Sequence, residues 1–415
     1  MRRVLLALTV GLLMNSPTAF AAVSDEVVQQ LLQRLEAQEK RIAELEKNAQ
    51  QTQTAVEEQK QAVAEVAARP AASAPAPASW ADKLSLKGDL RLRYENIDDE
   101  NASDERNRAR IRARLALIAK PQDNLEIGLG LTTSQDNDPV SGNQTLGDGN
   151  SNKNFALSLA YFKWAALEGL TVSGGKFQNP LYRPGQHALL WDSDWNPEGF
   201  GLNYVSGPFF ANAIGFWLES DSKNDKAFTW GGQLGAAVPI ADEVKLTAGA
   251  GYYHFNTRGK GTFYGSDTNF LGNSYDSITN SYLYDYEEIE GFAELGFKLA
   301  GLPASVFADY VKNTDADEFD TGWAAGAQLG AAKAKGTWQL GYTWQDLEPD
   351  AVFAGLADSD FGGGKTDNKG HRLQGVYALS DKWNLGLTYF INETGGKRGT
   401  EKDYDRLQLD MSFKY

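Results

Sequence analysis

The nine residues Leu407-Gln408-Leu409-Asp410-Met411-Ser412-Phe413-Lys414-Tyr415 alternate apolar and polar side chains without interruption. A period of two is that of a β-strand with one apolar and one polar face. Because this strand is the last segment of the chain and finishes on an aromatic residue, we interpret its apolar positions as the seam that closes a sheet. These positions are Leu409, Met411, Phe413 and Tyr415. The alternative is an ordinary amphipathic edge strand.

The same alternation begins at Leu84 and recurs through the remainder of the chain. It is found in 84–94 and 106–117 and near 125–134, 154–165, 170–177, 199–206, 209–219, 227–239, 244–256, 286–299, 303–313, 320–333, 336–346, 368–379, 383–393 and 403–415. Short connectors such as 120–124 and 380–382 alternate with long polar loops such as 135–153, 257–285 and 347–367. This pattern predicts an all-β transmembrane barrel of about 16 antiparallel strands over 83–415, in which alternate residues face lipid and water. A soluble sandwich would instead bury the apolar face against a second sheet.

Several features of the composition bear on the compartment and the class of protein. Arg2 and Arg3, the apolar run 4–14 and Ala19-Phe20-Ala21 predict a signal peptide over 1–21. The apolar run is too short for a transmembrane helix. The chain has no cysteine, so disulfides contribute nothing to its stability. A formal charge of −15 argues against nucleic acid as a partner.

Residues 22–69 form a separate segment with a period of 3.5. Apolar residues such as Val28, Leu31, Leu35, Ile42 and Leu45 fall at the a and d positions of six heptads in one frame. This pattern predicts a periplasmic coiled coil. The stretch Arg41–Glu46 resembles a short motif of trimeric coiled coils, so we favour three chains over two. A lone amphipathic helix is the alternative. The residues expected to hold the trimer are Val28, Leu31, Leu35, Arg41, Ile42, Leu45 and Glu46. A Pro/Ala-rich linker follows over 70–82.

Sixteen predicted strands, a trimerising stalk and a terminal aromatic together resemble the trimeric porins of the Gram-negative outer membrane. Within them the chain is similar to a porin family with an N-terminal coiled coil. The most local motif is Gly175-Lys176-Phe177-Gln178-Asn179-Pro180-Leu181-Tyr182-Arg183. The resemblance implies that a third long loop, here 178–198, folds into the lumen and narrows it. Trp191 and Trp195 are expected to anchor this loop against the wall.

An arginine row on the second strand supplies the charge expected to oppose that loop. Charged side chains facing lipid cost about 2–4 kcal/mol each near the membrane midplane, so the row has to face water or acidic partners. We predict a pore constriction in which a basic wall faces an acidic loop and sets up a transverse field. Its residues are Arg108, Arg110, Arg112, Arg114, Asp192, Asp194 and Glu198. The alternative is that some of these arginines line a wide vestibule.

No pattern of catalytic or metal-ligating residues emerges from the sequence. His187, His254 and His371 lie far apart, with no nearby nucleophile and no metal-ligand spacing. We expect a solvated or pore-facing His187, and solvated charges at Glu287, Glu288 and Glu290. The sequence therefore predicts a protein that is not an enzyme and uses no cofactor or metal.

These features together predict an outer-membrane porin for passive diffusion of small hydrophilic solutes or ions. The alternatives are an anion-selective porin of the phosphate-porin kind and a structural tether to peptidoglycan. The expected partners are outer-membrane lipid, further copies in a homotrimer, small solutes and, through the stalk, peptidoglycan. A fully helical stalk would reach about 65–70 Å into the periplasm.

Overall fold

The computed structural model describes residues 83–135, 137–221 and 226–415, and scattered positions between 29 and 60. The chain divides into two units, Met1–Pro77 and Ala78–Tyr415. The predicted signal peptide 1–21 and linker 70–82 lie outside the described residues. No helix in the described part of the chain is long and apolar enough to cross a membrane.

The described positions of the N-terminal unit are helical. They include the continuous stretch 38–44, in which Arg41 and Ile42 lie, and Ile42 is 55% exposed. An exposed apolar residue on a helix suits a contact with further chains, but the coiled coil itself stays a prediction. The other residues expected to hold the trimer, namely Val28, Leu31, Leu35, Leu45 and Glu46, lie outside the described residues.

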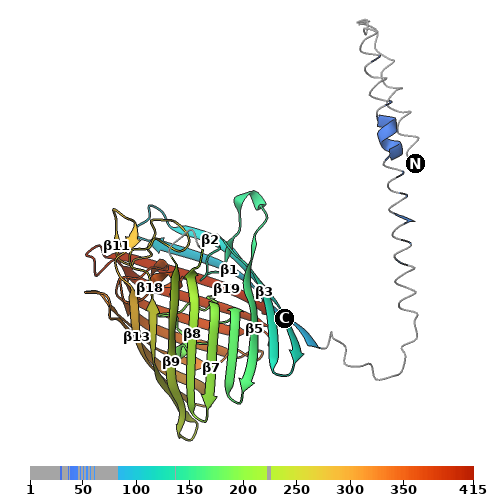
Figure 1. The fold of residues 1–415 in the computed structure, drawn as a ribbon. Coiled ribbons are helices and arrows are strands. Elements are labelled where there is room, and N and C mark those ends of the chain that lie inside the picture. Colours follow the sequence, from blue (N-terminus) through green and yellow to red (C-terminus); the bar gives the residue numbers. More distant parts are fainter. Residues whose placement is uncertain are drawn as a thin grey trace, which may run out of the picture. The chain divides into compact units, whose positions relative to one another are not determined.

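Sixteen long antiparallel strands form a closed barrel (Figure 1). They are β1 (Leu84–Asp99), β2 (Arg106–Gln122), β3 (Leu125–Thr133), β5 (Phe155–Leu167), β6 (Leu170–Lys176), β7 (Glu198–Ser206), β8 (Phe209–Glu219), β9 (Ala227–Ala241), β10 (Val244–Phe255), β13 (Tyr286–Leu299), β14 (Leu302–Asn313), β15 (Thr321–Gly330), β16 (Trp338–Leu347), β17 (Asn368–Ala378), β18 (Trp383–Thr394) and β19 (Lys402–Lys414). The predicted number of long strands is confirmed, and each predicted segment corresponds to one of them.

Short elements lie in the loops between these strands. They are the two-residue strands β4 (Gln144–Thr145), β11 (Tyr275–Asp276) and β12 (Ser281–Tyr282), and the 3-10 helices η2 (Asp148–Asn150), η3 (Pro184–Gln186), η4 (Ala354–Leu356) and η5 (Phe361–Gly363).

The last strand closes the cylinder, because β19 pairs with β18 on one side and β1 on the other. Leu409 lies opposite Tyr94, Met411 opposite Leu92 and Phe413 opposite Leu90. Tyr415 follows the strand; its backbone N–H donates to the Gly88 carbonyl at 3.1 Å and its hydroxyl to the Arg114 carbonyl at 3.1 Å. The apolar seam expected from the sequence therefore joins the first and last strands.

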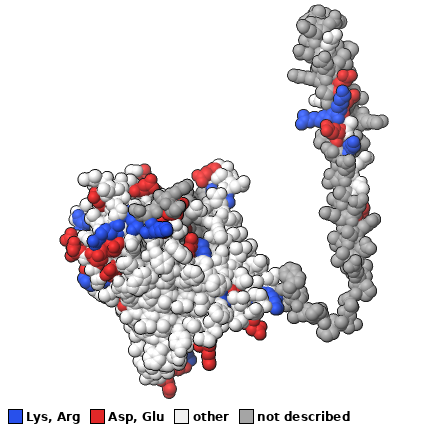
Figure 2. All heavy atoms as spheres, viewed as in Figure 1, with Lys and Arg blue, Asp and Glu red and all other residues white. Residues whose placement is uncertain are grey.

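The outer face of the barrel is apolar, and charged groups gather beyond it. On the visible face, Lys, Arg, Asp and Glu gather at the long-loop end and a few lie along the short-turn edge, with an uncharged belt between them (Figure 2). Exposed aromatic side chains mark both margins of this belt. Tyr94, Trp217, Trp230, Tyr310 and Trp323 lie toward the long loops, and Trp164, Tyr204, Trp338, Tyr377 and Trp383 toward the short turns. This is the arrangement of an outer-membrane barrel.

Two long loops fold into the lumen rather than covering its mouth. Loop L3 (177–197) contains the buried residues Leu189, Leu190, Trp191 and Trp195, and loop L7 (348–367) contains the buried Val352, Phe353 and Leu356. With Phe216, Tyr253, Phe255 and Tyr286 of the wall they form one hydrophobic cluster. L7 corresponds to the segment 347–367, which was expected to be a polar loop, so its apolar interior was not anticipated. These loops fill the part of the lumen beside β8, β10 and β13.

Candidate functional site

The wall opposite that cluster carries seven arginines on the inner face of β19, β1 and β2, which we call the arginine wall. Register places Arg91 opposite Arg112, Arg93 opposite Arg110, and Glu95 opposite Arg108. Like charges directly opposite on neighbouring strands are destabilising unless other groups compensate. The members of the arginine wall are Arg91, Arg93, Arg108, Arg110, Arg112, Arg114 and Arg406.

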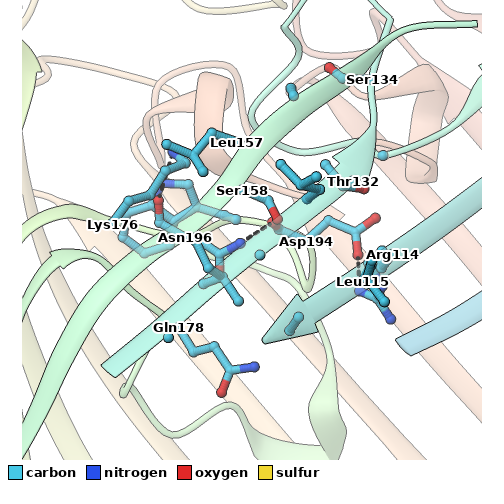
Figure 3. Close-up of a pocket in the computed structure, with 18 of the residues that line it drawn as sticks. Arg114, Leu115, Thr132, Ser134, Leu157, Ser158, Lys176, Gln178, Asp194 and Asn196 are labelled. Carbon is cyan, nitrogen blue, oxygen red and sulfur yellow. Dashed lines mark hydrogen bonds and ion pairs between the residues drawn. The ribbon is translucent and has the colours of Figure 1, made fainter. Parts of the chain in front are cut away.

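Loop L3 supplies one compensating carboxylate. Asp194 accepts a hydrogen bond from Nη1 of Arg112 at 3.0 Å. It also accepts one from Nη1 of Arg114 at 3.1 Å (Figure 3). Asp89 of β1 pairs with the same two arginines at 3.2 and 2.7 Å. Burial alone would raise the pKa of Asp194, but Arg112 and Arg114 outweigh it and hold that pKa below its usual value. The structure therefore joins L3 to β2 through direct ion pairs.

The other predicted constriction residues have different partners. Arg108 and Arg110 both pair with Glu95, Arg110 at 3.6 Å. Asp192 is buried and accepts the backbone N–H groups of Asp194 at 2.8 Å and Ser359 at 3.0 Å. Burial, with Asp194 and Asp358 nearby, raises the pKa of Asp192 well above its usual value. Thus Asp192 shapes L3 and its junction with L7.

Glu198 is not part of this cluster. It begins β7 rather than ending L3, its side chain is 63% exposed, and it pairs with Lys176 at 2.7 Å. Among the described residues it forms no ion pair with any member of the arginine wall. Of the seven predicted residues, Arg112, Arg114 and Asp194 form ion pairs with one another. Arg108 and Arg110 lie on the same strand but pair with Glu95, and Asp192 is bonded within L3 and to L7. Glu198 lies outside the group.

Loop L3 is anchored to the far wall by aromatic packing. Trp191 stacks on Trp195 with ring centroids 4.8 Å apart and meets Tyr253 of β10 edge-on at 4.9 Å. Trp195 packs against Phe216 of β8 at 5.0 Å. The expectation that these two tryptophans hold the loop to the wall is confirmed.

Polar contacts reinforce this attachment. The Tyr182 hydroxyl donates to Glu294 of β13 at 2.6 Å, and the Gly185 carbonyl accepts from Gln328 of β15 at 2.6 Å. L3 therefore contacts β13 and β15 on one side and the arginine wall on the other, and it crosses the lumen.

Two expectations about polar residues near L3 are wrong. His187 is 1% exposed, where it packs near Phe307 and its Nε2–H donates to Gln345 at 2.7 Å. Glu288 and Glu290 are also buried: Glu288 accepts the Phe353 backbone N–H, and Glu290 accepts the Tyr253 hydroxyl, both at 2.8 Å. Their burial follows from the inward fold of L3 and L7, which covers the inner face of the strands. Glu287 points outward and is partly exposed, as expected.

Loop L7 supplies a second acid that the sequence reasoning missed. Asp360 pairs with Arg93 at 3.1 Å and Arg406 at 2.8 Å. These cations outweigh the effect of burial and lower the pKa of Asp360. Apolar residues on both sides of Asp358–Asp360, at 351–357 and Phe361, are the signal that L7 is not a solvated loop.

Two cavities remain along the arginine wall. One of about 970 Å³ lies toward the short turns and is lined by residues including Arg114, Asp194, Lys176 and Asn196 (Figure 3). A second of about 680 Å³ lies toward the long loops and is lined by Arg108, Arg110, Asp360 and Arg406 among others. Asp138 and Ser141 of loop L2 (134–154) border both cavities. In the described residues, no cluster of three or more His, Asp or Glu side chains is placed to hold a metal.

The chain matches known porins in sequence and fold. A family model described as "Putative porin" matches 96–282 and 275–415. No curated protein matches. A structure of OprB from Pseudomonas putida at high pH has a TM-score of 0.56 and 13% identity, covering 81% of this chain and 95% of that one. A Salmonella typhi OmpF complex with daunomycin has a TM-score of 0.48 and 12% identity, covering 80% and 97%. Family and fold together establish an outer-membrane channel, and the chain belongs to this porin family.

Proposed function

We propose that this porin lets small hydrophilic solutes and ions diffuse passively along the arginine wall, through a passage narrowed by L3. Two observations support this proposal. L3 contacts β13 and β15 at one end and Arg112 and Arg114 at the other. The two cavities lie along the arginine wall. Solutes would pass between fixed charges of both signs in a low-dielectric enclosure, which orients polar molecules and excludes apolar ones.

The test is single-channel recording of the purified full-length protein in a planar bilayer under a KCl gradient. We expect discrete, ohmic conductance steps in the wild type. Arg112→Ala with Arg114→Ala should raise the cation-to-anion permeability ratio by about threefold, or about 0.7 kcal/mol. Lys298→Ala, a charge removed at the short-turn end of β13, serves as the control. The absence of conductance, or an identical reversal potential in the double variant, would contradict the proposal.

An anion-selective channel is a second candidate. It is supported by the arginine wall, whose seven guanidinium groups have five carboxylates within 4.0 Å in the described residues: Asp89, Glu95, Asp194, Asp360 and Asp410. In a KCl gradient, a wild-type reversal potential displaced toward that of chloride supports the anion-selective channel, and one near zero or displaced toward that of potassium contradicts it.

The helical N-terminal segment is proposed to trimerise the porin and extend from it into the periplasm. The heptads of 22–69 and the exposed Ile42 support this assembly role. A tether to peptidoglycan is an additional candidate role for the same segment. Co-sedimentation of the purified protein with peptidoglycan, with and without residues 22–77, tests the tether.

A further inference from the structure

The charges of the arginine wall are unevenly compensated. Arg91, Arg93, Arg110 and Arg112 form a square on adjacent strands, since Arg91 lies opposite Arg112 and Arg93 opposite Arg110. Arg93 has Asp360 and Asp410 as partners, and Arg112 has Asp89 and Asp194. In the part of the chain that the structure describes, Arg91 has no carboxylate within 4.0 Å. The positive charge of the square is thus in excess at the Arg91 corner.

Neutral groups of loop L2 occupy the position where an acid would compensate that corner. The Asn143 side-chain oxygen accepts from Nη2 of Arg91 at 2.7 Å, and the Asn143 backbone carbonyl accepts from Nη2 of Arg110 at 3.3 Å. Two oxygens of one residue therefore bridge two guanidinium groups, as two oxygens of an oxyanion would. An amide oxygen carries only a partial charge and gives a weaker bond to arginine than an ionised group does.

Three arginines of the square also have an unused donor. The Nε–H groups of Arg91, Arg110 and Arg112 are all buried without a hydrogen-bond partner. Buried guanidinium donors that stay unpaired are costly, and an anion that accepted from them would recover this cost. Two further carboxyl groups, those of Asp138 and Asp358, form no ion pair with an arginine in the described residues, and burial raises the pKa of both.

We propose that the square of Arg91, Arg93, Arg110 and Arg112 is a binding site for a small oxyanion, such as inorganic phosphate, in competition with Asn143. Arg110 and Asn143 line the cavity of about 680 Å³ toward the long loops, so an anion entering from that side meets them directly. Displacement of the Asn143 amide then gives the anion access to Arg91. This proposal deepens the proposed channel function and rests on it, because it assigns a solute class to one point of the passage.

The experiment measures inorganic phosphate as a blocker of the chloride-carrying current through the full-length protein. Titration calorimetry on the same protein in detergent gives the phosphate affinity independently. We expect phosphate to reduce the current in the wild type and Arg91→Gln to weaken phosphate binding by about tenfold, the effect of losing one charge-assisted contact. Arg106→Gln removes the same charge from an exposed position on β2 and should leave the affinity within about twofold.

Two substitutions at Asn143 test the competition without touching the square. Asn143→Asp places a carboxylate beside Arg91 and should abolish phosphate binding, whereas Asn143→Ala removes the competing amide and should preserve or strengthen it. Equal phosphate affinity in the wild type, Arg91→Gln and Asn143→Asp would overturn the site. A protein that conducts in KCl but ignores phosphate refutes this inference alone. A protein that does not conduct refutes the proposed function.

Discussion

Arg112 and Asp194 are joined by a two-contact ion pair in which Nη1 of Arg112 lies 3.0 Å from Oδ1 and 3.1 Å from Oδ2 of Asp194. One residue belongs to a rigid strand and the other to a loop that crosses the barrel, so this pair fixes how far L3 stands from the arginine wall. Removing one partner of a buried ion pair costs about 3–5 kcal/mol when the other is left uncompensated. Asp89 also pairs with Arg112, so it offsets part of that cost here.

Asp194→Asn should therefore loosen L3 and make the passage more positive. We expect the anion-to-cation permeability ratio to rise by about threefold, or about 0.7 kcal/mol, and the thermal midpoint of unfolding to fall. Salt-gradient reversal potentials and differential scanning calorimetry measure the two effects. Glu198→Gln, which changes an acid outside the ion-pair cluster, is the matched control. A reversal potential that moved equally in both variants would show that Asp194 has no special position.

Trp191→Ala should release L3 from the far wall. Trp191 is 1% exposed and packs on Trp195 and Tyr253, and truncating a buried aromatic residue of this kind costs about 3–5 kcal/mol. Single-channel traces should show a larger or fluctuating conductance. Trp323→Ala, on the outer face of β15 where the side chain is 42% exposed, should leave the open-channel conductance unchanged. A stable conductance of wild-type size in Trp191→Ala would exclude the anchoring role.

His187 should make the attachment of L3 sensitive to acid. Burial, together with Arg372, lowers the pKa of His187 from 6.5 to about 3. Because the unfolded chain binds this proton more readily, the stabilisation is complete above about pH 6.5 and is lost as the pH falls toward 3. His187→Gln should flatten the decline of the unfolding midpoint between these values and match the wild type in pH dependence near pH 8. If the unfolding midpoint of His187→Gln declined with falling pH as steeply as that of the wild type, His187 would not be the cause of the acid sensitivity.

The stalk should control the oligomeric state. Leu35→Asn combined with Ile42→Asn places polar groups at two a positions of the heptads, which should shift the protein from trimer toward monomer. Native mass spectrometry or light scattering in detergent measures the species. Lys40→Gln, at an outward-facing f position, should leave the assembly intact. Trimers that persist in the double variant at low protein concentration would place the association in the barrel instead.

The barrel was predictable from sequence because its two environments impose a period of two on each strand. Lipid selects Leu409, Met411 and Phe413 on one face of β19, and the lumen selects polar residues on the other, so the strand count and the faces could be read directly. The inward fold of a third long loop followed from resemblance to porins, and the tryptophans of that segment indicated how it is held.

The partners of each charge were decided by tertiary structure alone. The sequence placed Arg108, Arg110, Arg112 and Arg114 on one face, but it could not show that Glu95 takes two of them and Asp194 the other two. Nor did it show that L7 brings Asp360 to Arg93, or that His187, Glu288 and Glu290 become buried. Ion pairs and burial inside a barrel depend on where loops from distant segments contact the wall. The local periodicity of the sequence carries no information about these contacts.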